Sequence, residues 1–534
     1  MAKKAKVTLH PKFTIGEISP RLYGAFMEPI GTIVNGSMYN PKHPTADENG
    51  FRRDFLQALK ETGLPALRLP GGNFVSGWEW KDSIGPKDQR KAHLDLAWHQ
   101  YIPNDVGHDE YLQWAELAGT EPMYTINLGT GTILDAIHIA EYTNHEGGTY
   151  WSDLRKKYGR EKPYGVKTWY LGNEMDGPWQ IGSWEKDPKG YGVLANEVSK
   201  AMKWVDGSIE TAVCASSSPF LAHYPQWDLE VLQECYNAVD YVSMHHYHTA
   251  APGNYAQLLG GSAYIEDYIE TEAALCDFVQ AKMRSPRKLM LSFDEYGAMS
   301  RPLEGIRHPG WGPYNLYASH YKFSPEDTYV RHDPNNMEQR RFPGGDMVGA
   351  LGNTSTLLAF LRHADRVKIG CMTGGLATLC ATDRDHVWKT AAYYPFHQLM
   401  EYGRGVSLRV AVDCETFDLP AYAVNDTSQY PSKEGLPFVD TAAAYDEENG
   451  TLNLFAINRD WEGDTDVELD VSAFEGYRFV EQIQLYSDDM EAKNTYEAPD
   501  TILPTVSDTA KEENGVVTAT MKRLSWNVFR FVKE

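Results

Sequence analysis

The sequence predicts a two-part architecture, a (β/α)8 TIM barrel followed by an all-β C-terminal sandwich of the jelly-roll-like type. In the first two-thirds of the 534 residues, short apolar segments alternate with amphipathic helical patterns, which is typical of parallel strands joined by helical crossovers. After about residue 385 the helical patterns give way to strands with period-two alternation. The expected parts are a strand over 1–18 that joins the sandwich, a barrel over 19–385 and the sandwich over 386–534.

Eight apolar segments are the expected barrel strands, and between them apolar residues recur three or four positions apart. Phe51, Phe55 and Leu59, for example, share one face of the first clear helix. The eight segments span residues 22–28, 65–72, 121–129, 166–174, 211–218, 239–247, 288–296 and 364–372. Eight such units predict a closed barrel, whose functional residues lie at the C-terminal ends of the strands.

Polar side chains gather at those strand ends. The strand-end groups are Glu28, Gly71-Gly72-Asn73, Asn173-Glu174, His245-His246-Tyr247 and Asp294-Glu295. A barrel would bring all five to one mouth although they are far apart in the chain. Two long segments on the same side, 79–108 and 297–345, are expected to form loops that shape the site.

The C-terminal third reads as successive strands with hairpin turns at Asn449-Gly450 and Asn514-Gly515. The N-terminal segment 6–16 also alternates and is expected to complete this sandwich as one strand. We expect the sandwich to be structural rather than a separate carbohydrate-binding module. No repeat or disordered linker interrupts the chain, so the sandwich should pack tightly on the barrel.

Charge and cysteine usage restrict the partners and the compartment. The chain carries 50 Lys and Arg against 74 Asp and Glu, a net charge of −24, which argues against nucleic acid and anionic membranes. No apolar run is long enough to span a membrane, and the N-terminus lacks the apolar core of a signal peptide. The six scattered cysteines contain no CxxC pair, which predicts free thiols and a cytoplasmic protein.

Two strand-end carboxylates suit the cleavage of a glycosidic bond. Retention of configuration needs one carboxyl group as proton donor and one as nucleophile, about 5–5.5 Å apart. Glu174 ends the fourth strand and Glu295 the seventh, so they should face each other across the mouth. Asp176 and Asp294 are rival carboxylates. Asp176 follows the strand in a turn and Asp294 alternates with Glu295, so both are expected to point elsewhere.

These segments resemble a known family. The strings LGNEMDGPWQIG (171–182), LSFDEYG (291–297), LPGGNFVSGWEW (69–80) and LYGAFMEPIG (22–31) are similar to those of the α-L-arabinofuranosidases of glycoside hydrolase family 51. The resemblance covers almost the whole chain. It implies that Glu174 is the general acid/base and Glu295 the nucleophile. It also implies a furanose-binding shell, with two tryptophans beside the aglycone and a histidine as a supporting hydrogen-bond partner: Glu28, Arg68, Asn73, Asn173, Tyr247, Trp98, Trp179 and His245. The alternatives are that Arg68 mainly orients or charge-balances Glu295 and that Trp179 only packs.

The resemblance further implies no metal and no organic cofactor, a neutral oligosaccharide substrate and a homo-oligomer, in the family often a hexamer. Three positions depart from the family pattern. Pro29 stands where the family usually has His, Tyr296-Gly297 stands for Trp-Asn, and Gly374 replaces a glutamine that touches the sugar. These departures leave both carboxylates intact and bear on the choice of sugar.

The function expected from these features is an exo-acting retaining α-L-arabinofuranosidase that removes terminal non-reducing arabinofuranosyl residues from arabinan- or arabinoxylan-type oligosaccharides. The nearest alternative keeps the mechanism and takes another furanoside, such as a β-D-galactofuranoside. A non-catalytic sugar-binding protein would more often have lost one of the two glutamates. A phosphate-handling isomerase or aldolase would need a strand-end lysine, which the chain lacks. A zinc site at His245-His246-Tyr247-His248 is disfavoured because neighbouring residues of a strand point to opposite faces.

Overall fold

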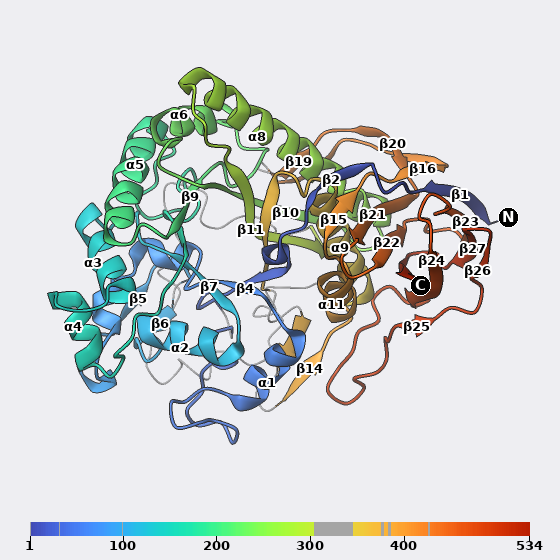
Figure 1. Cartoon of the computed structure of the whole chain (residues 1–534). Helices are drawn as coiled ribbons and strands as arrows, with labels where there is room; N and C mark the ends of the chain where they lie inside the picture. The colour runs from blue at the N-terminus through green and yellow to red at the C-terminus, as the bar shows by residue number, and fades with distance from the viewer. Residues whose placement is uncertain are drawn as a thin grey trace.

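A computed structural model describes residues 2–30, 33–98, 100–303, 345–374, 379–382, 386–425 and 428–534. Eight parallel strands close into a barrel in the order β10-β11-β12-β3-β4-β7-β8-β9 (Figure 1). Their bounds are β3 Gly24–Phe26, β4 Ala66–Leu69, β7 Glu121–Thr125, β8 Thr168–Tyr170, β9 Glu210–Cys214, β10 Tyr241–Ala250, β11 Met290–Ser300 and β12 Val367–Thr373. Each overlaps one of the eight predicted segments, and the predicted fold class is confirmed.

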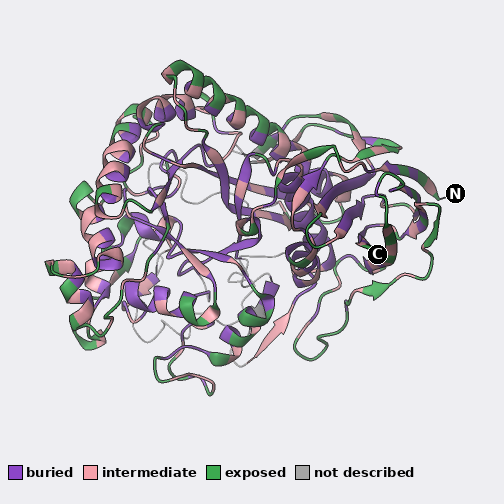
Figure 2. Ribbon diagram, in the orientation of Figure 1, coloured by how far each residue is buried: buried purple, intermediate pink, exposed green. Residues whose placement is uncertain are grey.

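Helices cover the outside of the barrel and present their polar faces to solvent, while the strands are buried on both sides (Figure 2). They are α1 Arg53–Thr62, α2 His108–Ala118, α3 Ile133–Asn144, α4 Tyr150–Lys157, α5 Pro188–Val205, α6 Gln226–Cys235, α7 Tyr255–Leu259, α8 Ser262–Met283, α9 Met347–Arg362 and, after the barrel, α11 Tyr393–Tyr402. Inside the barrel, a layer that includes Phe26, Met123 and Tyr170 fills the space below the mouth. None of these helices, within the residues described, carries a stretch long and apolar enough to cross a membrane.

Two β-sheets form the C-terminal part. A seven-stranded sheet has the order β2-β15-β21-β22-β28-β24-β25, and a five-stranded sheet has the order β16-β1-β23-β27-β26. Their strands are β1 Lys3–Thr8, β2 Thr14–Glu17, β15 Val406–Leu408, β16 Ala411–Cys414, β21 Val439–Asp446, β22 Thr451–Asn458, β23 Thr465–Asp470, β24 Tyr477–Leu485, β25 Thr505–Val506, β26 Lys511–Glu513, β27 Val516–Met521 and β28 Ser525–Lys533. The N-terminal segment therefore supplies one strand to each sheet, not the single strand expected, because a turn at Pro11 separates β1 from β2.

The seven-stranded sheet lies between the barrel and the second sheet. On one face Phe455 and Trp526 stack on each other and join the main core of the barrel, and on the other Leu454 and Phe529 join the core between the two sheets. Trp526 also donates a hydrogen bond to Gln398 of α11 at 2.7 Å. The sandwich is thus packed directly on the barrel.

Candidate active site

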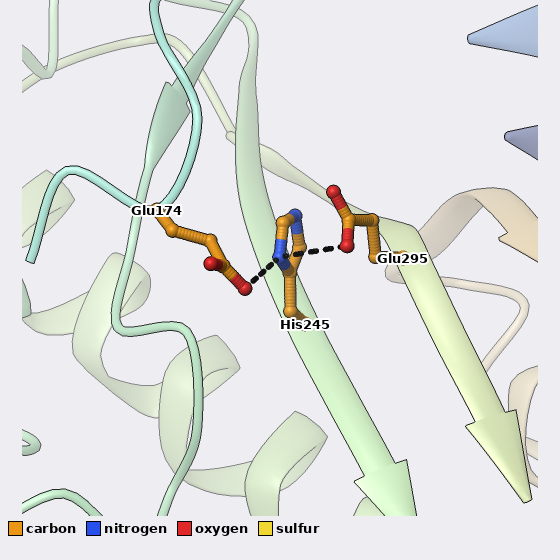
Figure 3. A group of neighbouring side chains, drawn as sticks. All are labelled: Glu174, His245 and Glu295. Atoms are coloured by element: carbon orange, nitrogen blue, oxygen red, sulfur yellow. Dashed lines mark hydrogen bonds and ion pairs between the residues drawn. The ribbon is translucent and has the colours of Figure 1, made fainter. Parts of the chain in front are cut away.

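Two glutamates from opposite parts of the barrel meet at its mouth. Glu174 follows β8 and Glu295 lies within β11, and each is largely buried, with side chains 11% and 7% exposed. One oxygen of each carboxylate and a ring nitrogen of His245 lie within 4.8 Å of one another (Figure 3). Glu174 has φ 44°, a left-handed conformation that costs a non-glycine residue about 1–3 kcal/mol and is most common at functional sites.

Glu174 accepts two hydrogen bonds from side chains beside it. His245 Nδ1 lies 3.0 Å from one carboxylate oxygen, and Trp179 Nε1 donates to the other at 2.6 Å. Burial raises the pKa of Glu174, although both hydrogen bonds act in the opposite direction. A carboxyl group with a raised pKa keeps its proton closer to neutral pH, as a proton donor must.

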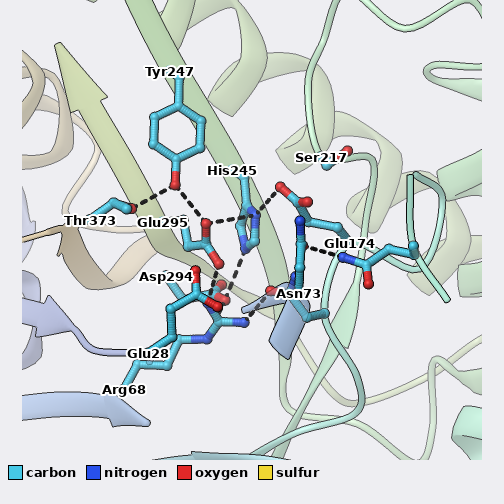
Figure 4. A network of polar contacts seen from close by, with 12 residues as sticks. Glu28, Arg68, Asn73, Glu174, Ser217, His245, Tyr247, Asp294, Glu295 and Thr373 are labelled. Atoms are coloured by element: carbon cyan, nitrogen blue, oxygen red, sulfur yellow. Dashed lines mark hydrogen bonds and ion pairs between the residues drawn. The ribbon is translucent and has the colours of Figure 1, made fainter. Parts of the chain in front are cut away.

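Glu295 is held by a cation and a hydroxyl. Arg68 Nη1 donates to one carboxylate oxygen at 2.7 Å, and the Tyr247 hydroxyl donates to the other at 2.6 Å (Figure 4). Arg68 is fully buried and lies over the rings of Phe26 and Tyr170, so its charge depends on nearby carboxylates for compensation. Both partners of Glu295 stabilise an anionic, oriented carboxylate.

Asp294 also reaches this network, which corrects the expectation that it points elsewhere. Its carboxylate lies 3.0 Å from Arg68 Nε and 3.2 Å from His245 Nε2. The cause is a β-bulge: β10 pairs Ser243 with Ser292 and then His245 with Glu295, so β11 has one extra residue there. A bulge breaks the alternation of side chains. Burial alone would raise the pKa of Asp294, but the charges of Arg68 and His245 outweigh burial and hold that pKa below its usual range.

His245 connects Glu174 on one side of the network with Asp294 on the other. Burial alone would lower its pKa, but the charges of Glu295 and Asp294, with hydrogen bonds to Asp294 and Glu174, raise that pKa to about 10. Of the residues described, Glu174, His245 and Glu295 form the one group with metal-ligand spacing. A protonated imidazole has no lone pair for a metal, so the arrangement suits an ion-pair network better. His246 and His248 turn to the other face, where they pack beside Phe220 and Tyr264.

Asp176 does not reach the two glutamates. It is fully buried and accepts hydrogen bonds from the backbone N–H and the hydroxyl of Ser217, and its carboxylate lies 2.9 Å from His223 Nε2. The turn that carries Glu174 is therefore tied by Asp176 to the segment after β9. This position agrees with the expectation that Asp176 points away from the site.

The remaining predicted shell surrounds Arg68 and Glu28. Arg68 Nη2 donates to Asn173 at 2.7 Å, and Asn173 donates to Asn73 at 2.8 Å. Trp98, in the turn between β5 (His93–Asp95) and β6 (Gln100–Ile102), donates to Glu28 at 3.1 Å. The segment 79–108, predicted as a loop over the mouth, thus reaches the site through this hairpin.

Glu28 is a buried carboxyl group that stays protonated near neutral pH. Burial and the charge of Glu295 raise its pKa to about 8. The backbone of Gly72 approaches so closely that a Cβ there would lie 2.6 Å from a Glu28 oxygen. Glycine at this position therefore makes room for the carboxyl group.

Sequence reasoning missed two polar residues of the network. Gln180 donates to Asn73 and accepts from Ser76 at 2.8 Å, and the hydroxyl of Thr373 lies 2.8 Å from that of Tyr247. Gln180 lies inside the string NEMDGPWQ, which could have pointed to it. Thr373 ends β12, so the rule that strand ends line the mouth could have found it.

The departures from the family pattern have different surroundings. Pro29 accepts a hydrogen bond from Gln100 through its carbonyl, and Tyr296 is buried against Phe360 on the outer side of the barrel. Gly297 is paired with Tyr247, and a Cβ on it would lie 3.6 Å from that ring, an ordinary contact. Gly374 has φ 60°, which favours glycine. Of the loop expected over 297–345, residues 304–344 lie outside the described residues.

Replacing Glu28 with Gln should stabilise the protein at neutral and alkaline pH while it lowers activity. Because the folded-state pKa is raised, the folded protein holds a proton that the unfolded chain has lost between about pH 4.5 and 8, so wild-type stability falls over that window. Glu28→Gln removes this dependence. Its Tm should exceed that of the wild type by about 2 °C at pH 8 and match it near pH 4.5, with kcat/KM about 100-fold lower.

Differential scanning calorimetry across pH 4.5–8.5 measures this difference. The matched control is Glu146→Gln on an exposed loop, for which no pH-dependent gain is expected. A Glu28→Gln protein that is less stable than the wild type at pH 8 would contradict the protonated state of Glu28.

Fold and site together define a glycoside hydrolase built on a (β/α)8 barrel with an appended β-sandwich. The family model of the α-L-arabinofuranosidase 1 domain matches residues 57–258, and that of the α-L-arabinofuranosidase C-terminal domain matches residues 306–525. The intracellular exo-α-(1→5)-L-arabinofuranosidase 1 of Bacillus subtilis strain 168 is 38% identical over 100% of both chains. A relative of the same function name from Acetivibrio thermocellus is 35% identical over 99% of this chain and 100% of its own.

The solved structures agree. A family 51 α-L-arabinofuranosidase from Bifidobacterium longum superimposes with a TM-score of 0.83 at 30% identity, covering 99% of this chain and 100% of the other. The chain belongs to the α-L-arabinofuranosidases of glycoside hydrolase family 51.

Proposed function

We propose that this enzyme is an exo-acting, retaining α-L-arabinofuranosidase that releases terminal non-reducing α-L-arabinofuranosyl residues by double displacement. The observation that carries the mechanism is the closeness of the two carboxylates, whose nearest oxygens lie within 4.8 Å. Retaining glycosidases keep the two groups about 5–5.5 Å apart, whereas inverting ones leave about 6.5–9.5 Å for a water molecule.

The surroundings of each carboxylate suit a different role. Glu295, held by Arg68 and Tyr247, attacks the anomeric carbon, while Glu174 gives its proton to the departing oxygen. A water molecule then enters beside Glu174, which removes a proton from it as general base, and the water oxygen bonds to the anomeric carbon as the bond to Glu295 breaks. His245 and Trp179 stabilise the Glu174 carboxylate that exists between the two steps.

The shell around Arg68 supports recognition of a neutral furanose by hydrogen bonds. Asn173 and Asn73, oriented by Arg68 and Gln180, present amide groups to sugar hydroxyls. Protonated Glu28 can donate to a further hydroxyl. The bonds of Trp179 to Glu174 and of Trp98 to Glu28 support the proposal that these two tryptophans flank the aglycone. The function names of the relatives support α-(1→5)-linked arabino-oligosaccharides as substrates.

The test is hydrolysis of aryl α-L-arabinofuranoside beside aryl β-D-galactofuranoside, α-D-arabinofuranoside and β-D-xyloside. We expect strong release from the first alone. Proton NMR of the first product should show the α-anomer of arabinose before mutarotation. A β-anomer as the first product would exclude double displacement. Preference for the galactofuranoside would keep the mechanism and move the specificity to that sugar.

We also propose a cytoplasmic location and a homo-oligomeric state. The six cysteines are all free, five of them buried, and the relatives above are named intracellular. Light scattering coupled to size-exclusion chromatography measures the subunit number, for which the resemblance implies a hexamer.

A further inference from the structure

Among the residues that the structure describes, one edge of strand β10, which carries His245 and Tyr247, has no neighbouring strand near the mouth. β10 pairs with β9 over Tyr241–Ser243 alone, whereas its pairing with β11 continues to Ala250. Backbone groups buried along such an edge need partners from elsewhere, because an unpaired buried peptide group is costly. The partners found here come from the C-terminal part of the chain.

An arm of the sandwich, described over residues 416–425 and 428–437, reaches over to this edge. It contains two small antiparallel pairs, β17 (Thr416–Leu419) with β20 (Lys433–Pro437) and, further out, β18 (Tyr422–Asn425) with β19 (Ser428–Tyr430). Strand β19 lies beside β10 (Figure 1), and a hydrogen bond joins the two strands. Tyr430 donates its hydroxyl to the carbonyl of Tyr247 at 3.1 Å, and the Tyr422 hydroxyl accepts from Ala251 N–H at 2.9 Å.

Aromatic packing fixes the position of Tyr430. The residue is 2% exposed, and its ring lies 4.6 Å from His248, 4.9 Å from Phe220 and 5.0 Å from Tyr264, between ring centroids. Tyr264 of α8 in turn donates to the carbonyl of Pro431 at 2.9 Å. The arm is therefore anchored on the barrel, and this packing holds the Tyr430 hydroxyl against the carbonyl of Tyr247.

Only Tyr247 lies between Tyr430 and the proposed nucleophile, Glu295. Tyr247 is bonded to the arm through its carbonyl, and through its hydroxyl it donates to Glu295 at 2.6 Å. We propose that Tyr430, from the C-terminal domain, is a positioning residue that holds Tyr247 against Glu295, so that the sandwich completes the catalytic site of the barrel. This inference rests on the nucleophile role proposed for Glu295.

Replacing Tyr430 with Phe tests the proposal because it removes the hydroxyl and keeps the ring. Displacement of a catalytic group by a fraction of an ångström to 1 Å costs about 10–100-fold in rate, so we expect kcat to fall about 10-fold with KM within twofold of the wild type. The matched control is Tyr23→Phe, which removes an equally buried tyrosine hydroxyl that donates to a backbone carbonyl, that of Gly403 at 2.9 Å, and touches neither the arm nor β10. It should change kcat less than twofold.

A double-mutant cycle with Tyr247→Phe separates positioning from general destabilisation. If Tyr430 acts through the Tyr247 hydroxyl, Tyr430→Phe should cost less than twofold in kcat once that hydroxyl is absent. Fully additive losses, or wild-type kcat in folded Tyr430→Phe, would overturn the proposal. Thermal unfolding of each variant is recorded, and assays are run below the lowest transition. If Tyr430→Phe does not fold, Tyr422→Phe, which loosens the same arm at Ala251, replaces it in the cycle with the same expectations.

The two proposals fail in different ways. Activity retained in Glu295→Ala would remove the nucleophile assignment whatever the cycle shows. An inactive Glu295→Ala together with an unaffected Tyr430→Phe would remove the positioning role alone.

Discussion

Replacing Glu295 with Ala should lower kcat/KM for aryl α-L-arabinofuranosides by at least about 10⁴-fold, because the covalent step loses its nucleophile. The fold should persist because Asp294, 3.0 Å from Arg68 Nε, still compensates the buried charge, and the substitution frees only a small volume beside Arg68 and Tyr247. Added sodium azide can enter that volume and attack the anomeric carbon directly. A single displacement inverts the configuration, so the expected product is the β-L-arabinofuranosyl azide, which NMR identifies.

The control for this experiment is Glu146→Ala, which removes an exposed glutamate from the segment between α3 and α4 and should leave kcat/KM unchanged. An α-azide from Glu295→Ala would mean that another carboxylate forms the intermediate. Asp294, 3.0 Å from Arg68, would then be the residue to replace next.

Replacing Glu174 with Ala should produce a loss that depends on the leaving group. A phenolate leaving group whose phenol has a low pKa departs without a proton, so the first step survives. The value of kcat is then limited by the slow release of the sugar from Glu295. Oligosaccharides, whose leaving alcohol needs the proton, should lose about 10³-fold in kcat/KM. Azide attacks the glycosyl-enzyme without general-base help, and the two displacements together should yield the α-azide.

The two azide products distinguish the roles of the carboxylates within one assay. Retained azide from Glu174→Ala and inverted azide from Glu295→Ala would support the assignment of acid/base and nucleophile. Equal losses on all leaving groups in Glu174→Ala, without rescue by azide, would contradict the acid/base role. In that case the φ of 44° at Glu174 would reflect a structural turn alone.

The barrel strands could be predicted because each is a short apolar run, and five of the eight are closed by a polar group, a pattern that depends on nearest neighbours in sequence. The strands β4 and β8 are three or four residues long, yet the segments that contain them were recognised from the residues that follow, Gly71-Gly72-Asn73 and Asn173-Glu174. The division of the N-terminal segment was not predicted. Period-two alternation continues on both sides of Pro11 and does not show that β1 and β2 belong to different sheets.

In the candidate site, too, the sequence predicted some side chains correctly and others wrongly. Glu28, Arg68, Asn173, His245 and Glu295 were named from strand ends and motifs, and the structure brings them together. Asp294 was excluded by the rule of alternation, and this exclusion was wrong because a bulge in β11 turns the residue towards Arg68 and His245. Bulges depend on the register between two strands, which one strand's sequence does not reveal.

The sequence by itself indicated the family, the order of the strands and the two candidate glutamates, because these depend on residue type and on short-range spacing. Tertiary structure alone decided how the carboxylates are charged and held: the protonated Glu28, the imidazolium bridge of His245 between Glu174 and Asp294, and the contact of Tyr430 with Tyr247. These properties arise from burial and from contacts between residues far apart in the chain. Local sequence patterns do not reveal such contacts, because the contacts form only when the whole chain is packed.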